Sequence, residues 1–184
     1  MPGPRALGTG WLEAHQLLEA GYEQLRKGTE AGACEEWLKA WSLLLKTMDA
    51  SGLSRLSDID GALQGSSSVT VWVPDFHMML WNAGLKEPRF MQEGVGFTSE
   101  FLRRFEGDDL GLTQNVRCSL ASFHAKLGRQ EMADAMFREW LSADPQWGRG
   151  WARWAQRYSF RPWENDELAT RGVQILREIG RAHV

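Results

Sequence analysis

Three polar side chains in one short, mostly apolar segment are the residues best placed for chemistry. Asp75, His77 and Asn82 lie in the string WVPDFHMMLWNAG. In a closed pocket, a carboxylate, an imidazole and an amide could serve an enzyme or bind a small molecule. That hypothesis predicts a deep cavity around Asp75, and a solvent-open Asp75 would argue against it.

The spacing within this segment also allows a different role. On a helix, Asp75, Met79 and Asn82 lie at i, i+4 and i+7 and share a face, whereas His77 is two residues from Asp75 and points elsewhere. A carboxylate and an amide among apolar neighbours need hydrogen-bond partners. They either brace adjacent helices or, with Trp72, line a concave groove that holds a peptide.

A second group is aromatic. Trp147, Trp151, Trp154 and Tyr158 lie at i, i+4, i+7 and i+11, and such a stripe usually belongs to a core. Trp147 follows Pro145 closely and is expected to be partly exposed. Asn115, Arg117 and Arg153 could supply polar contacts from the inner helices. The candidate binding residues are Trp72, Asp75, Met79, Asn82, Asn115, Arg117, Trp147 and Trp151.

Other signals of catalysis are absent from the sequence. The histidines His15, His77, His124 and His183 do not fall at metal-ligand spacings with each other or with the cysteines. There is no phosphate-binding glycine loop, nucleophile elbow or HExxH string. We therefore expect no catalytic residue, no metal site and no cofactor.

The composition indicates a packed globular domain. The chain has 184 residues, 43% hydrophobic and 24% charged, with a net charge of −3. Its basic residues are scattered, so no nucleic-acid partner is expected. No apolar run reaches the roughly 20 residues of a membrane span. Cys34 and Cys118 have no nearby partner, which favours buried thiols and a cytoplasmic location.

Amphipathic periodicity predicts helices along most of the chain. The β-branched run 69–73 could be read as a strand, but a lone strand would lack a partner for its ladder. We therefore expect a helix that starts between Ser68 and Val73, with Pro74 in its first turn and Asp75 near the positive end of its dipole. The other expected helices span 11–27, 33–48, 53–63, about 88–105, 113–127, 130–143, 146–158 and 165–180.

A period of 34 residues organises the second half of the chain. Positions 117, 120, 121 and 124 match 151, 154, 155 and 158, and Gly128 falls at a helix–helix corner. Small and large apolar residues in this order are typical of tetratricopeptide (TPR) repeats. Gly21, Gly28, Ala33 and Trp37 match positions 121, 128, 133 and 137, each 100 residues later.

This pattern predicts an all-α fold, a TPR-like right-handed α-α superhelix of about eight or nine helices. Residues 11–184 would form a single helical-repeat domain with an irregular middle at 50–112. Residues 1–10 would be a flexible N-terminal tail.

Three strings carry a more specific resemblance: ACEEWLKAW at 33–41, Trp72 and Asp75 with NAG at 82–84, and DPQWG at 144–148 with Trp151 and Trp154. With these, residues 11–160 resemble a bacterial group of TPR-like proteins, many of which end in a SEC-C zinc-binding tail. Two departures are Pro74, where that group usually continues the helix, and the cysteine-free ending RAHV. The resemblance therefore implies the fold but no zinc tail, and it leaves the activity open.

The leading hypothesis is a non-catalytic interaction module that binds a peptide or helix of a partner protein in a concave groove. One alternative is a structural homo-oligomer, such as a homodimer, closed by the aromatic residues around Trp147 or by the last helix. The other is the enzyme or small-molecule binder around Asp75, His77 and Asn82.

Overall fold

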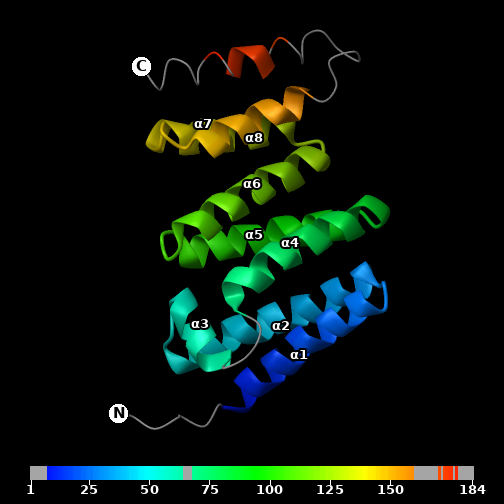
Figure 1. Ribbon diagram of the computed structural model, residues 1–184. Coiled ribbons are helices and arrows are strands. Elements are labelled where there is room, and N and C mark those ends of the chain that lie inside the picture. Colours follow the sequence, from blue (N-terminus) through cyan, green and yellow to red (C-terminus); the bar gives the residue numbers. More distant parts are fainter. Residues whose placement is uncertain (1–7, 64–67, 160–169, 171, 176, 178–184) are drawn as a thin grey trace. The chain divides into compact units, whose positions relative to one another are not determined.

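The computed structural model describes residues 8–63, 68–159, 170, 172–175 and 177, and in these residues it is helical with no strand. An all-α fold is therefore confirmed. Eight helices of the described part are labelled in Figure 1. They are α1 (Thr9–Arg26), α2 (Glu30–Ser51), α3 (Leu56–Leu63), α4 (Val69–Lys86), α5 (Arg89–Phe105), α6 (Leu110–Lys126), α7 (Gln130–Ala143) and α8 (Gly148–Ser159). None of the described helices is long and apolar enough to cross a membrane.

Most expected helices are found within a few residues of their expected ends. The run 69–73 is the start of α4, so the choice of a helix over a strand is confirmed. Of the expected tail, residues 1–7 lie outside the described residues, and Thr9 and Gly10 already belong to α1. Most of the expected helix 165–180 also lies outside the described residues.

The start of α4 differs from expectation in one respect. Pro74 lies inside the helix, beyond the first turn, where it cannot donate a hydrogen bond to the carbonyl of Thr70. Asp60 of α3, rather than Asp75, lies at the positive end of the dipole. It accepts a hydrogen bond from the Val69 amide at 2.7 Å. The cap also includes Ser68, whose Oγ accepts from the Thr70 amide at 3.3 Å.

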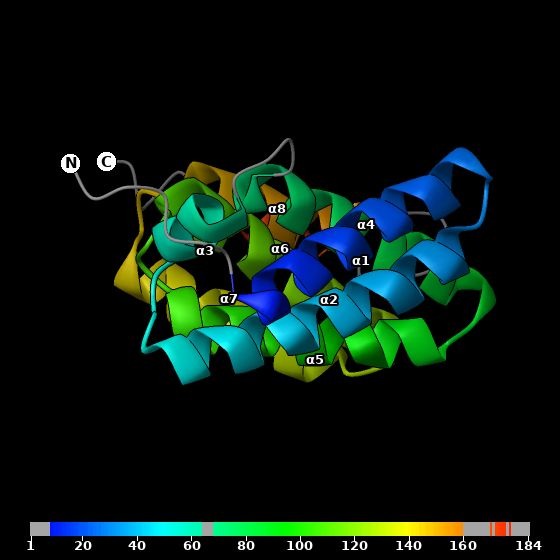
Figure 2. The ribbon, with the colours of Figure 1, turned by 90° about the horizontal axis from the view of Figure 1, so that it is seen from below.

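The helices divide into two compact units, residues 1–119 and 120–184. In the first, α1 packs against α2, α2 against α4 and α4 against α5. Figures 1 and 2 show α1 and α2 side by side as an antiparallel pair. The core between these helices is aromatic. Its members include Trp37, Trp41, Trp72, Phe76, Phe97, Phe101 and Phe105.

The two turns that hold Gly28 and Gly128 have matching hydrogen bonds. The Gly28 amide donates to the Leu25 carbonyl at 2.9 Å, and the Gly128 amide donates to the Ala125 carbonyl at 3.0 Å. Each glycine has a positive φ, 77° and 79°, which favours glycine at the end of a helix. The expectation that Gly128 lies at a helix–helix corner is confirmed.

In the second unit, α7 and α8 pack through aromatic rings. Phe137 of α7 stacks on Trp154 of α8, with ring centroids 6.1 Å apart. Trp147 and Trp151 also lie in this core.

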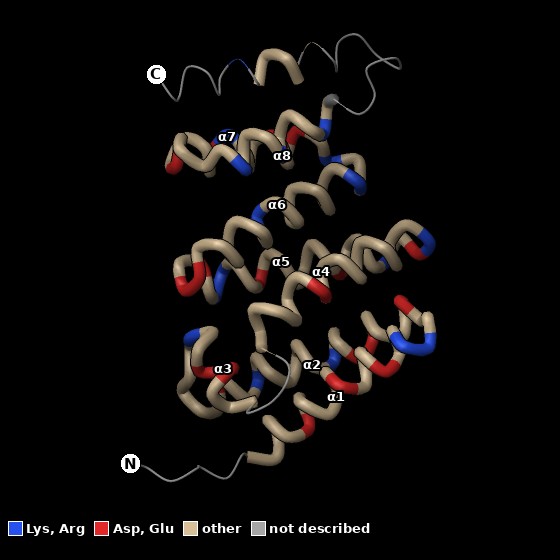
Figure 3. The backbone as a smooth tube through the Cα atoms, viewed as in Figure 1, with Lys and Arg blue, Asp and Glu red and all other residues tan. Residues whose placement is uncertain are grey.

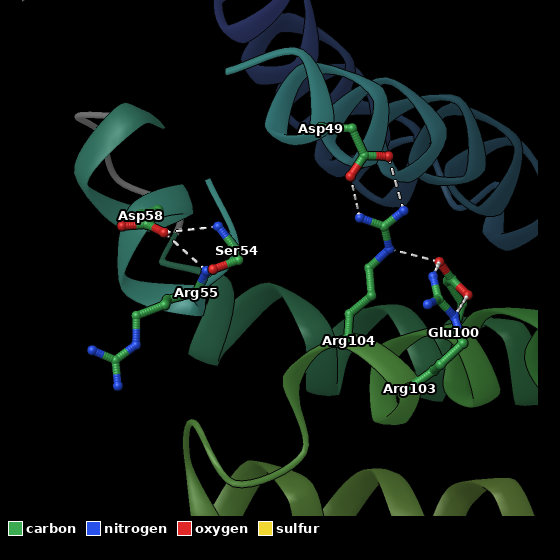
Figure 4. Close-up of polar contacts among 7 residues, drawn as sticks. All are labelled: Asp49, Ser54, Arg55, Asp58, Glu100, Arg103 and Arg104. Carbon is green, nitrogen blue, oxygen red and sulfur yellow. Dashed lines mark hydrogen bonds and ion pairs between the residues drawn. The ribbon is translucent and has the colours of Figure 1, made fainter. Parts of the chain in front are cut away.

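Polar contacts tie the ends of the helices in the first unit together (Figure 4). Arg104 of α5 binds both carboxylate oxygens of Asp49 of α2, at 2.6 and 3.0 Å. The same side chain donates from Nε to Glu100 at 2.7 Å. Asp58 caps α3 by accepting from the amides of Ser54 and Arg55. These contacts hold α2 and α5 together near the chain segment that leads into α3 and α4.

Candidate functional site

Helix α4 carries a line of apolar side chains that its own unit leaves uncovered. Val71, Met78 and Leu85 are 56%, 50% and 55% exposed, and each is seven residues from the next. Between them lie Pro74 and Trp81, both half-buried. We call these five residues the α4 stripe. It extends over about 21 Å, at 1.5 Å of rise per residue.

The opposite face of α4 explains why the stripe points outward. Val69, Trp72, Val73, Phe76 and Leu80 are fully buried, and α4 packs on α2 and α5. A helix with this many core residues is fixed in its rotation about its own axis. The stripe is therefore held in one orientation by the core. Figure 3 shows that α4 carries few charges along its length.

The edge of the stripe that faces α1 is polar and acidic. Tyr22 of α1 donates a hydrogen bond to a carboxylate oxygen of Asp75 at 3.1 Å. Burial and the Asp75 carboxylate raise the pKa of Tyr22 above its usual value, with a smaller contribution from Glu19. Tyr22 therefore keeps its proton, and both Asp75 and Glu19 are close enough to act on it electrostatically. Asn82, seven residues after Asp75, is also half-buried.

The four sequence-predicted residues of α4 separate into two groups. Asp75 and Asn82 border the stripe, where a bound molecule could reach them. Trp72 is fully buried and stacks on Phe76 with centroids 5.3 Å apart, and Met79 is only 8% exposed. Trp72 and Met79 therefore support the helix from the core and present no surface to a partner.

Trp147 and Trp151 belong to the core of the second unit. The expectation that Trp147 is partly exposed is wrong, because it is 4% exposed. Its ring lies over Gly150, where an added Cβ would come within 2.4 Å of the indole. Trp151 donates its indole N–H to the carbonyl of Pro145 at 3.0 Å. The exposed aromatic surface proposed around Trp147 for a dimer is therefore not present there.

Asn115 and Arg117 lie on α6, and both are half-buried. Arg117 pairs with the carboxylate of Glu106. The backbone carbonyl of Asn115 accepts a hydrogen bond from Ser119 at 3.2 Å. These two contacts lie within α6 and the segment before it.

A buried polar network in the second unit was not foreseen from the sequence. Asp134 is 2% exposed and accepts hydrogen bonds from the Trp154 indole at 2.7 Å and from the Tyr158 hydroxyl. Arg157 donates to the Ala121 carbonyl and to Gln130 at 2.8 and 3.0 Å. The sequence did contain one indication of this network. Asp134 lies beside Ala133 and three residues before Phe137, on the inward face of its helix. The network connects α6, α7 and α8.

A surface depression of about 640 Å³ lies between α1 and α2. Its lining includes Leu17, Leu38 and Leu43 with the side chains of Lys39 and Lys46. Asp75, His77 and Asn82 do not line this depression. Within the described part of the chain, no group of His, Cys, Asp or Glu residues is arranged to hold a metal ion.

Comparisons with family models, curated proteins and solved structures give no match to this chain. The resemblance to TPR-like proteins therefore stays a prediction, and a functional proposal has to rest on the geometry. The α4 stripe is one feature of that geometry, in the described residues, whose exposed side chains lie outside the core.

Proposed function

We propose that this chain is a non-catalytic interaction protein that binds a peptide or helix of a partner along α4. The observation that carries the proposal is the α4 stripe, with three large apolar side chains about half exposed at a regular spacing of seven residues. Scattered exposed apolar residues are normal, whereas an aligned set on one fixed helix marks an interaction surface.

Burial of this surface would contribute part of the binding free energy of a complex. Complete burial of a Val, Leu or Met side chain contributes about 1.5–3 kcal/mol, so half-exposed side chains would each add about 1 kcal/mol on binding. Because α4 is already ordered by its core, the stripe loses little conformational entropy when a partner binds. Pro74 and Trp81 would add contact area between the three larger contributions.

The scaffold that we propose is the TPR-like superhelix. The matching turns at Gly28 and Gly128, 100 residues apart, support a repeated helix pair. Repeats of this kind bury apolar faces against their neighbours and leave one helical face for ligands. A cytoplasmic location fits the buried thiols of Cys34 and Cys118. Burial raises the pKa of the Cys34 thiol to about 12, so this residue stays an unreactive thiol.

An enzyme around Asp75, His77 and Asn82 receives less support. Asp75 is half-buried at the edge of α4 and already accepts a hydrogen bond from Tyr22. The depression between α1 and α2 has other lining residues. This site would need a cavity at Asp75 to exclude water from a substrate.

The experiment is a selection of binding peptides from a random display library against the full chain. Peptides that bind the wild type are then tested against Met78→Ala and Met79→Ala. These adjacent methionines differ in exposure, at 50% and 8%. We expect Met78→Ala to weaken binding about fivefold, an effect of about 1 kcal/mol.

Met79→Ala is the matched control, because it removes the same atoms from the core side of the same helix. It should weaken binding less than Met78→Ala at a temperature where both variants are folded by circular dichroism. Selected peptides whose affinity is indifferent to Met78→Ala would refute the proposed surface.

A further inference from the structure

We infer that the partner of the α4 stripe is an amphipathic helix with apolar residues at heptad spacing and basic residues along the edge that meets Asp75 and Glu19. This inference rests on the proposed function and names the class of partner. It follows from the period of the stripe, from the state of the α4 backbone and from the charge at one edge.

The period of the stripe matches that of another helix. Val71, Pro74, Met78, Trp81 and Leu85 follow each other at intervals of three or four residues, the a and d positions of a heptad. A partner helix presents side chains at the same rise of 1.5 Å per residue, so contacts remain in step over the whole length. An extended peptide presents one side chain on a given face about every 7 Å, so its side chains do not stay aligned with those of the α4 stripe.

The backbone of α4 also favours a helix over an extended peptide. Extended peptides gain affinity from main-chain hydrogen bonds to an open sheet edge. The carbonyl and amide groups within α4 are used in its own ladder, apart from the carbonyl of Thr70 that faces Pro74. Side-chain packing is thus the main source of affinity on this surface, which is how helices bind in grooves.

The acidic edge specifies the charge of the partner. Asp75 accepts the hydrogen bond from Tyr22, Glu19 acts on Tyr22 electrostatically from α1, and both carboxylates are half-buried. A second carboxylate brought to this edge would be repelled, and a lysine or arginine would be attracted. Lys86, at the end of α4, pairs with Glu30 at 3.0 Å, so the nearest basic side chain of this helix is already engaged.

The same charges disfavour a second copy of this chain as the occupant. Two α4 helices paired through their stripes would bring two copies of the acidic edge into one interface. A basic partner helix avoids this repulsion. Self-association is therefore an outcome that would overturn the inference.

The test uses three synthetic peptides of about 21 residues, the length of the stripe with one turn added at either end. The first has leucine at the a and d positions and lysine along both edges. The second has the same leucines and glutamate along both edges. The third has the composition of the first in an order that removes the heptad. Binding to the full chain is measured by fluorescence anisotropy at low salt.

We expect the lysine peptide to bind at least tenfold more tightly than the glutamate peptide and the reordered peptide. Met78→Glu should reduce its affinity at least tenfold. Asp75→Asn should reduce the lysine-over-glutamate preference at least threefold while the fold, followed by circular dichroism, is retained. Tyr22→Phe is the control for loss of the Asp75 hydrogen bond, and it should keep the preference.

Equal binding of the lysine and glutamate peptides would overturn the inferred charge. Equal binding of the first and reordered peptides, or a dimer in sedimentation that is lost with Met78→Glu, would overturn the helical partner. These results differ from a failure of the proposed function itself. Library peptides that contain proline and lose affinity with Met78→Ala would support α4 as a binding surface. They would refute only the proposal that the partner is a helix.

Discussion

Gly21 of α1 lies directly against the indole ring of Trp37 of α2. A Cβ added at Gly21 would come 2.1 Å from Nε1 of that ring. The same nitrogen donates a hydrogen bond to the Leu18 carbonyl at 3.0 Å. The first helix pair thus depends on the smallest residue facing the largest one. Gly96 of α5, by contrast, faces open space.

Replacement of Gly21 by alanine should therefore destabilise the protein. The added methyl group displaces Trp37 from its position and its hydrogen bond, and overpacking of this kind costs about 1–3 kcal/mol. Gly96→Ala is the matched control in the interior of α5, where alanine improves helix propensity by up to about 1 kcal/mol. Urea unfolding followed by tryptophan fluorescence gives both values. A Gly21→Ala variant as stable as wild type would contradict the packing described.

Arg104 and Arg103 are neighbours with different roles, and their replacement by methionine should show it. Arg104 joins Asp49 of α2 to Glu100, and its side chain is 21% exposed, whereas Arg103 is 63% exposed and binds Glu100 within its own helix. We expect Arg104→Met to lower the free energy of unfolding by about 1 kcal/mol and Arg103→Met to lower it less.

Salt should reduce the difference between these two variants, and acid should reduce the effect of both. Screening in 1 M NaCl weakens exposed ion pairs. Hydrogen bonds from Arg103 and Arg104 lower the pKa of Glu100 to about 2 from 4.5. A lowered carboxyl pKa gives stability that is present above pH 4.5 and is lost as the pH falls towards 2. A difference that persists in high salt would point to packing of the Arg104 stem.

His124 should make the protein less stable at mildly acidic pH. Burial and the nearby Arg129 lower the pKa of His124 below 6.5. The unfolded state then binds a proton before the folded state does, so stability falls as the pH drops below about 6.5. His124→Gln removes this titration. Between about pH 7.5 and 5, the unfolding free energy of this variant should change less than that of the wild type. If the two proteins show the same pH dependence, protonation of His124 does not destabilise the fold.

The buried carboxylate of Asp134 should contribute strongly to stability. Asp134→Ala leaves the Trp154 indole and the Tyr158 hydroxyl without this acceptor, and each unsatisfied buried donor costs about 1–3 kcal/mol. Tyr158→Phe removes one donor and keeps the other bond, so its cost should be near 1 kcal/mol. Thermal unfolding of both variants tests this order, and a reversed order would be incompatible with the network.

Met78→Ala and Met79→Ala should also differ in stability. Removal of a buried methionine side chain costs about 2–5 kcal/mol, whereas surface substitutions usually stay within about 0.5 kcal/mol. Met79→Ala should therefore lower the unfolding free energy by several times more than Met78→Ala. Comparable losses would mean that the stripe is buried in solution, against the exposure described here.

Helix positions were predictable because the ends of several helices are marked by residues whose backbone conformation few other residues can adopt. Gly28 and Gly128 adopt positive φ values that other residues avoid, and apolar periodicity fills the intervals between breaks. Pro74 was placed too early in its helix, since proline is usually excluded from helix interiors. The actual start depends on Asp60, a residue of another helix, and no local pattern reveals that contact.

The α4 stripe was less accessible to sequence analysis. Val71, Met78 and Leu85 have the same residue types as the core of the same helix, and only packing separates Met78 from Met79. Asp75 and Asn82 were found because polar residues are rare in that segment. The Asp134 network was missed because a single aspartate in a helix is usually solvated.

The short helix α3 stabilises the start of α4 through the hydrogen bond from the Val69 amide to Asp60. Eight residues are too few for a helix that is stable alone, and α3 is held by its cap at Asp58 and by the bond from the Leu56 amide to Asp108 at 2.8 Å. When these two contacts break, the Val69 amide loses its hydrogen bond to Asp60. The following turn of α4 already lacks one backbone hydrogen bond, because Pro74 has no N–H to donate. The two segments should therefore open and close as a single cooperative event.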